Sequence, residues 1–210
     1  MPSTLIFPDG VRLARRDEIP GPEPQQSDAW ARVERAGIAR GFVLKSAIDE
    51  PFTHYAEINV DAPRLWELFC DLCQVLLGER ATFVAGEIDA ELVSVGPADV
   101  RTVIKLLARY QYQLAHDGFL QYGLVSDQSG AISEIFVTPA KYLKVWMSDE
   151  PAFQVAMARH EIKEVDHLEF LDEFPRTTVT LSPNSVALPS PDALIKQLQN
   201  EISVTGPHAD

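Results

Sequence analysis

The sequence predicts an α+β fold, in which a mainly antiparallel sheet carries helices packed on it. Short runs rich in β-branched and aromatic residues alternate with longer segments of helical period, and turn residues separate neighbouring runs at hairpin distance. A chain of 210 residues with 46% apolar content is long enough to build a core. We expect a loosely ordered N-terminal arm over 1–30, one α+β domain over 31–181, and a Pro-rich linker with a C-terminal helix over 182–210.

The first half of the predicted domain contains two hairpins and two helices. A buried helix is expected over 63–77, with Asp61 as its N-cap and Gly78 as its stop, because its polar residues fall on one narrow stripe. A second helix is expected over 98–116. Strands are expected at 41–47, 53–60, 81–88 and 91–96, and an edge strand of the arm around 3–7.

The second half continues with strands and ends in helices. The segment 141–147 fits both periods, and we favour a strand because Leu143, Val145 and Met147 alternate. Helices are expected over 149–160, with Pro151 in the first turn, and after Ser190, which can act as the N-cap. The remaining strands are expected at 119–126, 131–138, 167–171 and 177–182, the last two closing the sheet.

The two halves show a weak internal similarity. A shift of 118 − 41 = 77 positions aligns Gly41-Phe42 with Gly118-Phe119, and Glu57-Ile58 with Glu134-Ile135, without a gap. If this is a repeat over 41–117 and 118–181, the sheet is shared by two related halves, each a β-hairpin plus a helix. A chance match between two hairpins is the alternative.

The charge of the chain limits its partners. Thirty-one acidic and eighteen basic residues give a net charge of −13, which repels nucleic acid and anionic lipid. No apolar run approaches the roughly 18 to 20 residues of a membrane-spanning helix, so a cytoplasmic protein is expected. Such a charge favours capture of a basic protein partner, and solubility alone is the other explanation.

The two cysteines, Cys70 and Cys73, have the spacing of a redox or zinc-binding pair. They lie well inside the predicted helix 63–77, whereas a redox pair of this kind lies at a helix N-terminus. No second such pair and no suitably spaced His pair would complete four zinc ligands. We interpret both cysteines as structural, and we expect no metal and no cofactor.

Motifs of the common enzyme classes are missing from the sequence. It has no glycine-rich dinucleotide or P-loop motif and no hydrolase elbow, and His160 and His167 are seven residues apart rather than four. The basic stripe of the second helix, Arg101, Lys105 and Arg109, fits a solvated helix face better than a ligand site. An enzyme is therefore the less favoured class.

The stretch "HLEFLDEFP" (167–175) places three carboxylates among large apolar side chains. In a strand over 167–171, Glu169 would point to solvent, and Asp172 and Glu173 would form the following turn. We interpret the stretch as an exposed acidic edge, where aromatic anchors beside the charges would supply affinity. The predicted partner-binding residues are Asp149, Glu150, Glu169, Asp172, Glu173, Tyr142, Trp146 and Phe174.

The segment 118–181, containing "GFLQYGLVSDQSGAISEIFVTPAKYLKVW" and "LEFLDEFPRTTVTL", resembles the C-terminal part of small acidic bacterial immunity proteins of polymorphic or contact-dependent toxin systems. The resemblance covers about a third of the chain and has no invariant catalytic motif. It implies a non-enzymatic cytoplasmic inhibitor that binds one cognate toxin, and it carries over no individual residues.

Two other functions remain open at this point. A small-molecule-binding or enzymatic α+β domain would have its pocket between the helices and the sheet. A housekeeping interaction protein or oligomer subunit would have no toxin partner. The identity of the partner and the oligomeric state do not follow from the sequence.

Overall fold

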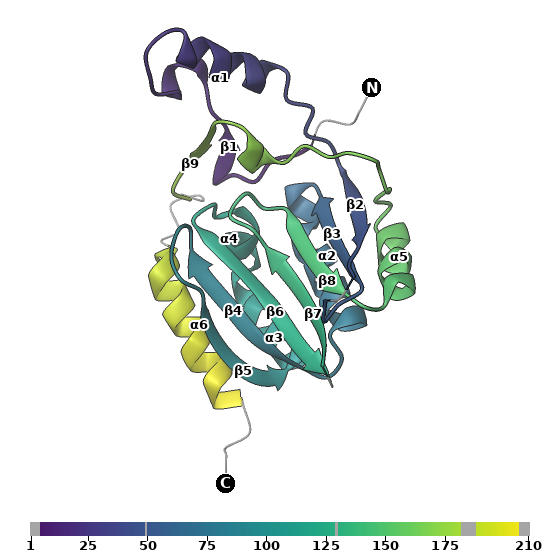
Figure 1. The fold of residues 1–210 in the computed structure, drawn as a ribbon. Helices are drawn as coiled ribbons and strands as arrows, with labels where there is room; N and C mark the ends of the chain where they lie inside the picture. The colour runs from purple at the N-terminus through teal and green to yellow at the C-terminus, as the bar shows by residue number, and fades with distance from the viewer. Residues whose placement is uncertain (1–4, 49, 129, 182–187, 206–210) are drawn as a thin grey trace.

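The computed structural model describes residues 5–48, 50–128, 130–181 and 188–205. Its centre is a seven-stranded sheet in which all neighbours are antiparallel, in the order β2-β3-β8-β7-β6-β4-β5 (Figure 1). The strands are β2 (Gly41–Ser46), β3 (His54–Asn59), β4 (Arg80–Glu87), β5 (Val93–Asp99), β6 (Leu120–Gln128), β7 (Ala131–Val137) and β8 (Leu143–Met147). The predicted α+β class with a mainly antiparallel sheet is confirmed.

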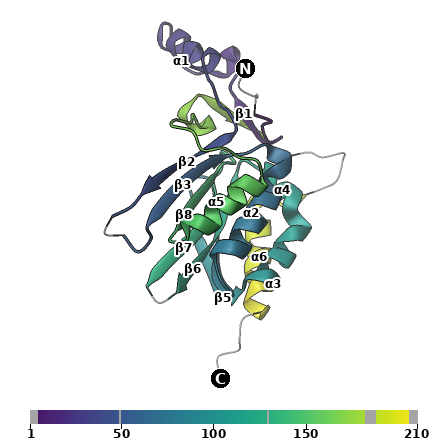
Figure 2. The same ribbon diagram turned by 90° about the vertical axis from the view of Figure 1, so that its right-hand side faces the viewer.

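Helices cover one face of this sheet, and among the described residues no helix lies on the other face (Figure 2). They are α2 (Ala62–Leu76), α3 (Val100–Leu107), α4 (Gln111–His116), α5 (Glu150–Arg159) and α6 (Pro191–Thr205). The face without helices, which we call the open face, is turned toward the viewer in Figure 1. This one-sided layering decides which strand residues can reach a partner.

The main core lies between the sheet and the helix layer. Alternate residues of each central strand point inward, so that Ala56, Val145, Ile135 and Leu124 form one cross-strand row of buried side chains. Helix α2 packs against them with its wide apolar surface, as its sequence predicts, and Pro63 fits its first turn.

A small cap lies beyond one end of the sheet. It contains a two-stranded antiparallel sheet of β1 (Val11–Leu13) and β9 (Arg176–Thr178), helix α1 (Gln25–Glu34), and the 3-10 turns η1 (Arg16–Glu18) and η3 (Leu171–Glu173) (Figure 1). Its own hydrophobic core includes the buried side chains of Val11, Ile38, Tyr142, Leu168 and Phe170. Residues near both ends of the predicted domain therefore meet in one cluster.

The N-terminal arm has more regular structure than its sequence suggests. Residues 11–13, 16–18 and 25–34 form regular elements, and α1 continues past residue 30. Around 3–7, where an edge strand is expected, residues 5–7 lie outside any strand, and positions 3 and 4 fall outside the described residues. The main chain of Ile6 instead bonds to the start of α2, donating to Asp61 Oδ1 and accepting from Ala62 N, both at 2.9 Å. The proposed domain boundaries stay a prediction.

The prediction that strands at 167–171 and 177–182 close the main sheet is wrong. Residues 167–170 have no regular structure, and Leu171 begins η3. Just before this segment, Glu164 forms an isolated bridge with Phe42 of β2. Buried Leu168 and Phe170 enter the core of the cap, so their alternation reflects packing in a loop rather than a strand. Of 177–182, Thr177 and Thr178 belong to β9, which pairs with β1 rather than with the main sheet, and Ser182 lies outside the described residues.

Two further expectations agree with the structure, and a third is modified. The ambiguous 141–147 contains strand β8, and Ser190 Oγ accepts from Ala193 N as the predicted cap of α6. The single helix expected over 98–116 is interrupted, because the 3-10 turn η2 (Ala108–Tyr110) separates α3 from α4.

The internal similarity ends after the two hairpins. Strands β3 and β7 occupy aligned positions, but β8 (143–147) aligns with residues 66–70, which lie inside α2. The second half thus adds a strand where the first half has a helix, and a shared pattern of hairpin plus helix does not extend through both halves.

Candidate functional site

The three carboxylates of the predicted acidic edge all make contacts within the chain. Glu169 Oε2 accepts from Gly37 N, Asp172 Oδ2 accepts from the hydroxyl of Tyr142 at 3.2 Å, and Glu173 Oε2 accepts from Phe170 N at 3.3 Å. Asp172 and Glu173 are exposed, as expected for a turn, whereas Glu169 is half-buried. These carboxylates hold the cap together, which is a structural role that the sequence does not reveal.

The remaining predicted acidic residues lie elsewhere. Asp149 is the N-cap of α5, accepting from Ala152 N at 3.0 Å, and Glu150 Oε2 lies 3.4 Å from His54 Nε2. Both follow β8 in the chain, whereas Tyr142, which contacts Asp172, precedes it. The two acidic groups therefore lie at opposite ends of β8 and do not form one cluster.

The predicted aromatic anchors also differ in position. Tyr142 is only 5% exposed and packs against Phe170, with ring centroids 4.4 Å apart, and Phe174 packs against the same cap core. Burial and the carboxylates of Asp172 and Glu57 raise the pKa of Tyr142. Trp146 alone among the three lies on the open face, where it is half-buried.

The open face carries two cross-strand rows that follow directly from the register. The first, which we call the Trp146 row, runs across six strands and consists of Lys45, Tyr55, Trp146, Glu134, Val125 and Thr82. The second, the Phe136 row, lies beside it and consists of Val43, Glu57, Lys144, Phe136, Gly123 and Val84. Cross-strand neighbours in such rows are close enough to contact one another.

Aromatic side chains occupy the middle of both rows. The rings of Tyr55 and Trp146 pack with centroids 5.1 Å apart and planes tilted by 43°. The ring of Phe136 lies over Gly123, where a Cβ would come within 2.9 Å of Phe136 Cδ2, so a larger residue at 123 would displace it. We call Tyr55, Phe136 and Trp146 the aromatic patch.

Charged residues surround the patch, and one of them has no partner. Glu57 Oε2 lies 3.8 Å from Lys45 Nζ and faces Lys144 across the strands. Burial and this same carboxylate raise the pKa of Tyr55. Glu134 lies opposite Trp146, and burial raises its pKa. Within the described part of the chain, no hydrogen bond or ion pair of the Glu134 carboxylate is present.

A shallow groove continues the open face at its β2 edge. It has a volume of about 460 Å³ and lies between β2 and the loop before η3. Glu57 belongs to both the groove and the Phe136 row. The groove is lined by Val43, Leu44, Lys45, Glu57, Glu164, Val165, Asp166, His167, Leu168, Phe170 and Glu173. The carboxylates of the groove extend the negative charge of Glu57 and Glu134, beside the patch, toward the cap.

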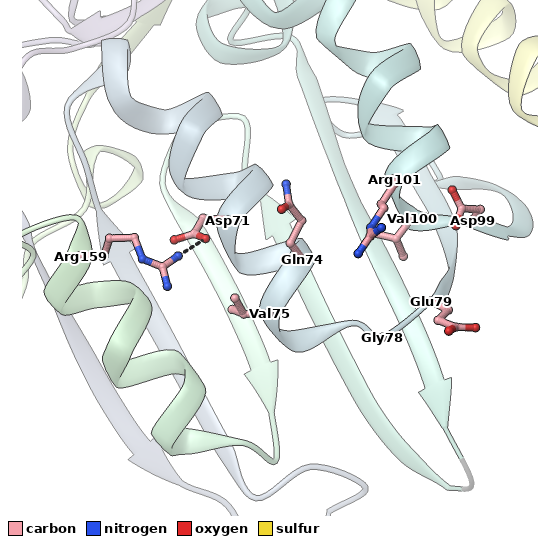
Figure 3. Close-up of a pocket in the computed structure, with 9 residues that line it drawn as sticks. All are labelled: Asp71, Gln74, Val75, Gly78, Glu79, Asp99, Val100, Arg101 and Arg159. Atoms are coloured by element: carbon pink, nitrogen blue, oxygen red, sulfur yellow. Dashed lines mark hydrogen bonds and ion pairs between the residues drawn. The ribbon is translucent and has the colours of Figure 1, made fainter.

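A larger hollow of about 690 Å³ lies on the helix layer, where parts of α2, α3 and α5 meet (Figure 3). Arg159 pairs with Asp71 at its border, and Asp71 Oδ2 also lies 3.1 Å from His160 Nε2. Arg101, of the basic stripe, also borders it, whereas Arg109 of that stripe pairs with Glu201 of α6. The lining charges are of both signs, so the hollow offers no consistent charge to a ligand.

The cysteines are placed as the sequence predicts for structural residues. Cys73 is completely buried in the main core and Cys70 is half-buried beside it. Burial raises the pKa of both thiols, that of Cys70 to about 12. Neither thiol is activated for redox chemistry.

The described residues contain neither a metal-binding cluster nor a membrane-spanning helix. No group of three or more His, Cys, Asp and Glu side chains there could hold a metal ion. No described helix combines the length and apolar character needed to cross a membrane. No family model, curated protein or solved structure matches this chain.

Sequence reasoning missed Tyr55, Glu134 and Phe136, although a signal for them is present. In "HYAEIN" and "AISEIFV" these residues alternate with the inward Ala56 and Ile135. Aromatic residues on the outward positions of a strand mark a face that a partner can cover. The sequence does not show, however, which strands stand side by side and bring them together.

Proposed function

We propose that this chain is a non-enzymatic binding domain that holds a basic protein partner on its open face. The observation that carries the proposal is the aromatic patch on the sheet face that the helices leave uncovered, where the half-buried rings of Tyr55 and Trp146 pack together beside the buried Phe136. Aromatic residues are favoured at the centre of protein interfaces, because they bury much area at low entropic cost.

The sign of the charge favours a basic partner. The net charge of −13, the unpaired Glu134 and the acidic groove together favour a positively charged surface. Rim carboxylates would accelerate association, and the buried rings would supply most of the affinity.

In its most concrete form, the proposal is a cytoplasmic immunity-type inhibitor that occludes a basic toxin domain. The resemblance of residues 118–181 to such proteins supports it, and this segment includes β6, β7 and β8, which carry Glu134, Phe136 and Trp146. An interface made by those strands would therefore lie largely within the resembling segment.

The test is co-expression with the product of the neighbouring gene, followed by measurement of the dissociation constant of the purified complex. Trp146→Ala is expected to weaken binding at least about tenfold, as truncation of a central aromatic anchor does. Trp66→Ala is the matched control, because Trp66 is also half-buried but lies on α2, in the helix layer.

The two variants also separate binding from folding. Both remove packing, so both are expected to lower the free energy of unfolding, but only Trp146→Ala should weaken the complex. Equal weakening by both variants, or a stable complex that Trp146→Ala leaves unchanged, would place the interface elsewhere. The stripe at Arg101 would then be the next surface to mutate.

A further inference from the structure

Glu134 is the one carboxylate in the two central rows without a cation. Glu57, in the neighbouring row, has Lys45 at 3.8 Å and faces Lys144 across the strands. The ammonium of Lys144 lies 5.7 Å from the ring of Tyr142, at the cap end of β8, and makes no ion pair with Glu134 in the described chain. The chain therefore compensates one of its two central carboxylates and leaves the other half-buried and unpaired.

An unpaired, partly desolvated carboxylate is unfavourable in the free protein. Burial raises the pKa of Glu134, which means that the charged form loses solvation and gains no compensating contact. A cation of a binding partner would supply the ion pair that Glu134 lacks within the chain. Such a cation would also form a stronger ion pair here than on an open surface, since a partner would exclude water from the site.

The neighbours of Glu134 favour one cation in particular. Trp146 stands directly opposite on β8 and Val125 directly opposite on β6, so Glu134 has an aromatic residue as its cross-strand neighbour on one side and an aliphatic residue on the other. Tyr55 packs against the far side of Trp146 and restricts its ring. A planar guanidinium can stack on an aromatic ring and bond a carboxylate with two N–H groups at once, whereas a strongly hydrated ammonium does this poorly.

We propose that Glu134 and Trp146 form a subsite for an arginine side chain of the basic partner. The guanidinium stacks on the indole of Trp146 and donates to the carboxylate of Glu134, while the aliphatic part of the arginine contacts Val125. This inference rests on the proposed function, because it assigns the partner chemistry at the centre of the same face.

The experiment compares two probes of equal charge, a nona-arginine and a nona-lysine peptide, at about 0.15 M salt. General attraction to the negatively charged chain acts on both peptides, so the informative quantity is the ratio of their dissociation constants. The wild-type protein is expected to bind the arginine peptide about tenfold more tightly, the order of one desolvated stacked ion pair. Addition of that peptide should shift the indole N–H resonance of Trp146, assigned through Trp146→Phe.

Glu134→Gln and Glu57→Gln form a matched pair of variants. Each removes one carboxylate from the same face, but Glu57 already has Lys45 as a partner. Glu134→Gln should abolish the preference for the arginine peptide and the shift of the indole resonance. Glu57→Gln should weaken binding of both peptides by the same factor and keep the preference. Equal wild-type affinities, no binding of either peptide, or a preference that survives Glu134→Gln would each overturn the subsite.

The outcomes also separate this inference from the proposed function. If the neighbouring gene product binds and Trp146→Ala weakens it, but the arginine preference is absent, the open face is the interface and the subsite is wrong. If Trp146→Ala does not weaken binding of the gene product, but the protein still binds the arginine peptide more tightly than the lysine peptide, the subsite stands and the proposed interface fails.

Discussion

Lys141 and Leu120 are joined by a buried hydrogen bond, in which the ammonium Nζ donates to the main-chain carbonyl over 2.8 Å. The same ammonium donates to the carbonyl of Leu114 at 3.0 Å, in the last helical turn before β6. Lys141 is only 4% exposed and lies in the turn between β7 and β8, with a positive φ of 62°. One side chain thus connects a hairpin turn, the end of α4 and the start of β6.

Replacement of this lysine should destabilise the protein. Lys141→Met leaves two buried carbonyl groups without a donor, which costs about 1 to 3 kcal/mol in the free energy of unfolding at pH 7. Urea unfolding followed by circular dichroism measures the difference. Lys105→Met on the exposed side of α3 is the control, with an expected change within about 0.5 kcal/mol. Equal midpoints for the two variants would contradict the role of the ammonium.

The same lysine predicts a pH dependence of stability. Burial lowers the pKa of Lys141 to about 7, against an unfolded value of about 10.4. Between these values the unfolded chain binds more protons, so this contribution is complete above the unfolded pKa and is lost as pH falls toward 7. The stability difference between wild type and Lys141→Met should therefore grow from pH 7 to pH 10. A difference independent of pH would show that the lysine titrates normally.

Reversal of the charge at Glu169 should weaken the cap. Glu169→Lys removes the acceptor of the Gly37 N–H, and a loss of about 1 to 3 kcal/mol in unfolding free energy is expected. Asp166→Lys makes the same change of charge at an exposed position of the same loop and should have little effect. Urea unfolding of both variants measures this. If the two are equally stable, the contact of Glu169 adds nothing to the fold.

The thiols of Cys70 and Cys73 should resist modification in the native protein. With pKa values raised by burial, almost no thiolate is present at neutral pH. A colorimetric disulfide reagent should label both slowly in buffer and rapidly in denaturant, and Cys73→Ala should cost about 1 to 2 kcal/mol through the cavity it leaves. Fast native labelling of Cys73, tested in Cys70→Ser, would show that the core around it opens readily.

Local patterns in the sequence determined much of the secondary structure. The stripe of α2, the alternation of β8 and the cap at Ser190 depend on residues close together in the chain, and each was predicted from them. The same holds for Cys73, since its place opposite the polar stripe of α2 is enough to bury it. Leu168 and Phe170 show the limit, because alternation along a loop resembles alternation along a strand.

Only the tertiary structure decided which residues share a surface. Tyr55 and Trp146 are 91 positions apart (146 − 55), and their packing depends on β8 inserting between β3 and β7 in the sheet order. The acidic stretch 167–175 shows the converse, since its carboxylates look free in the sequence but accept hydrogen bonds from Gly37, Tyr142 and Phe170. Strand order and long-range contacts follow from how the whole chain packs its apolar surface, and local periodicity carries no record of them.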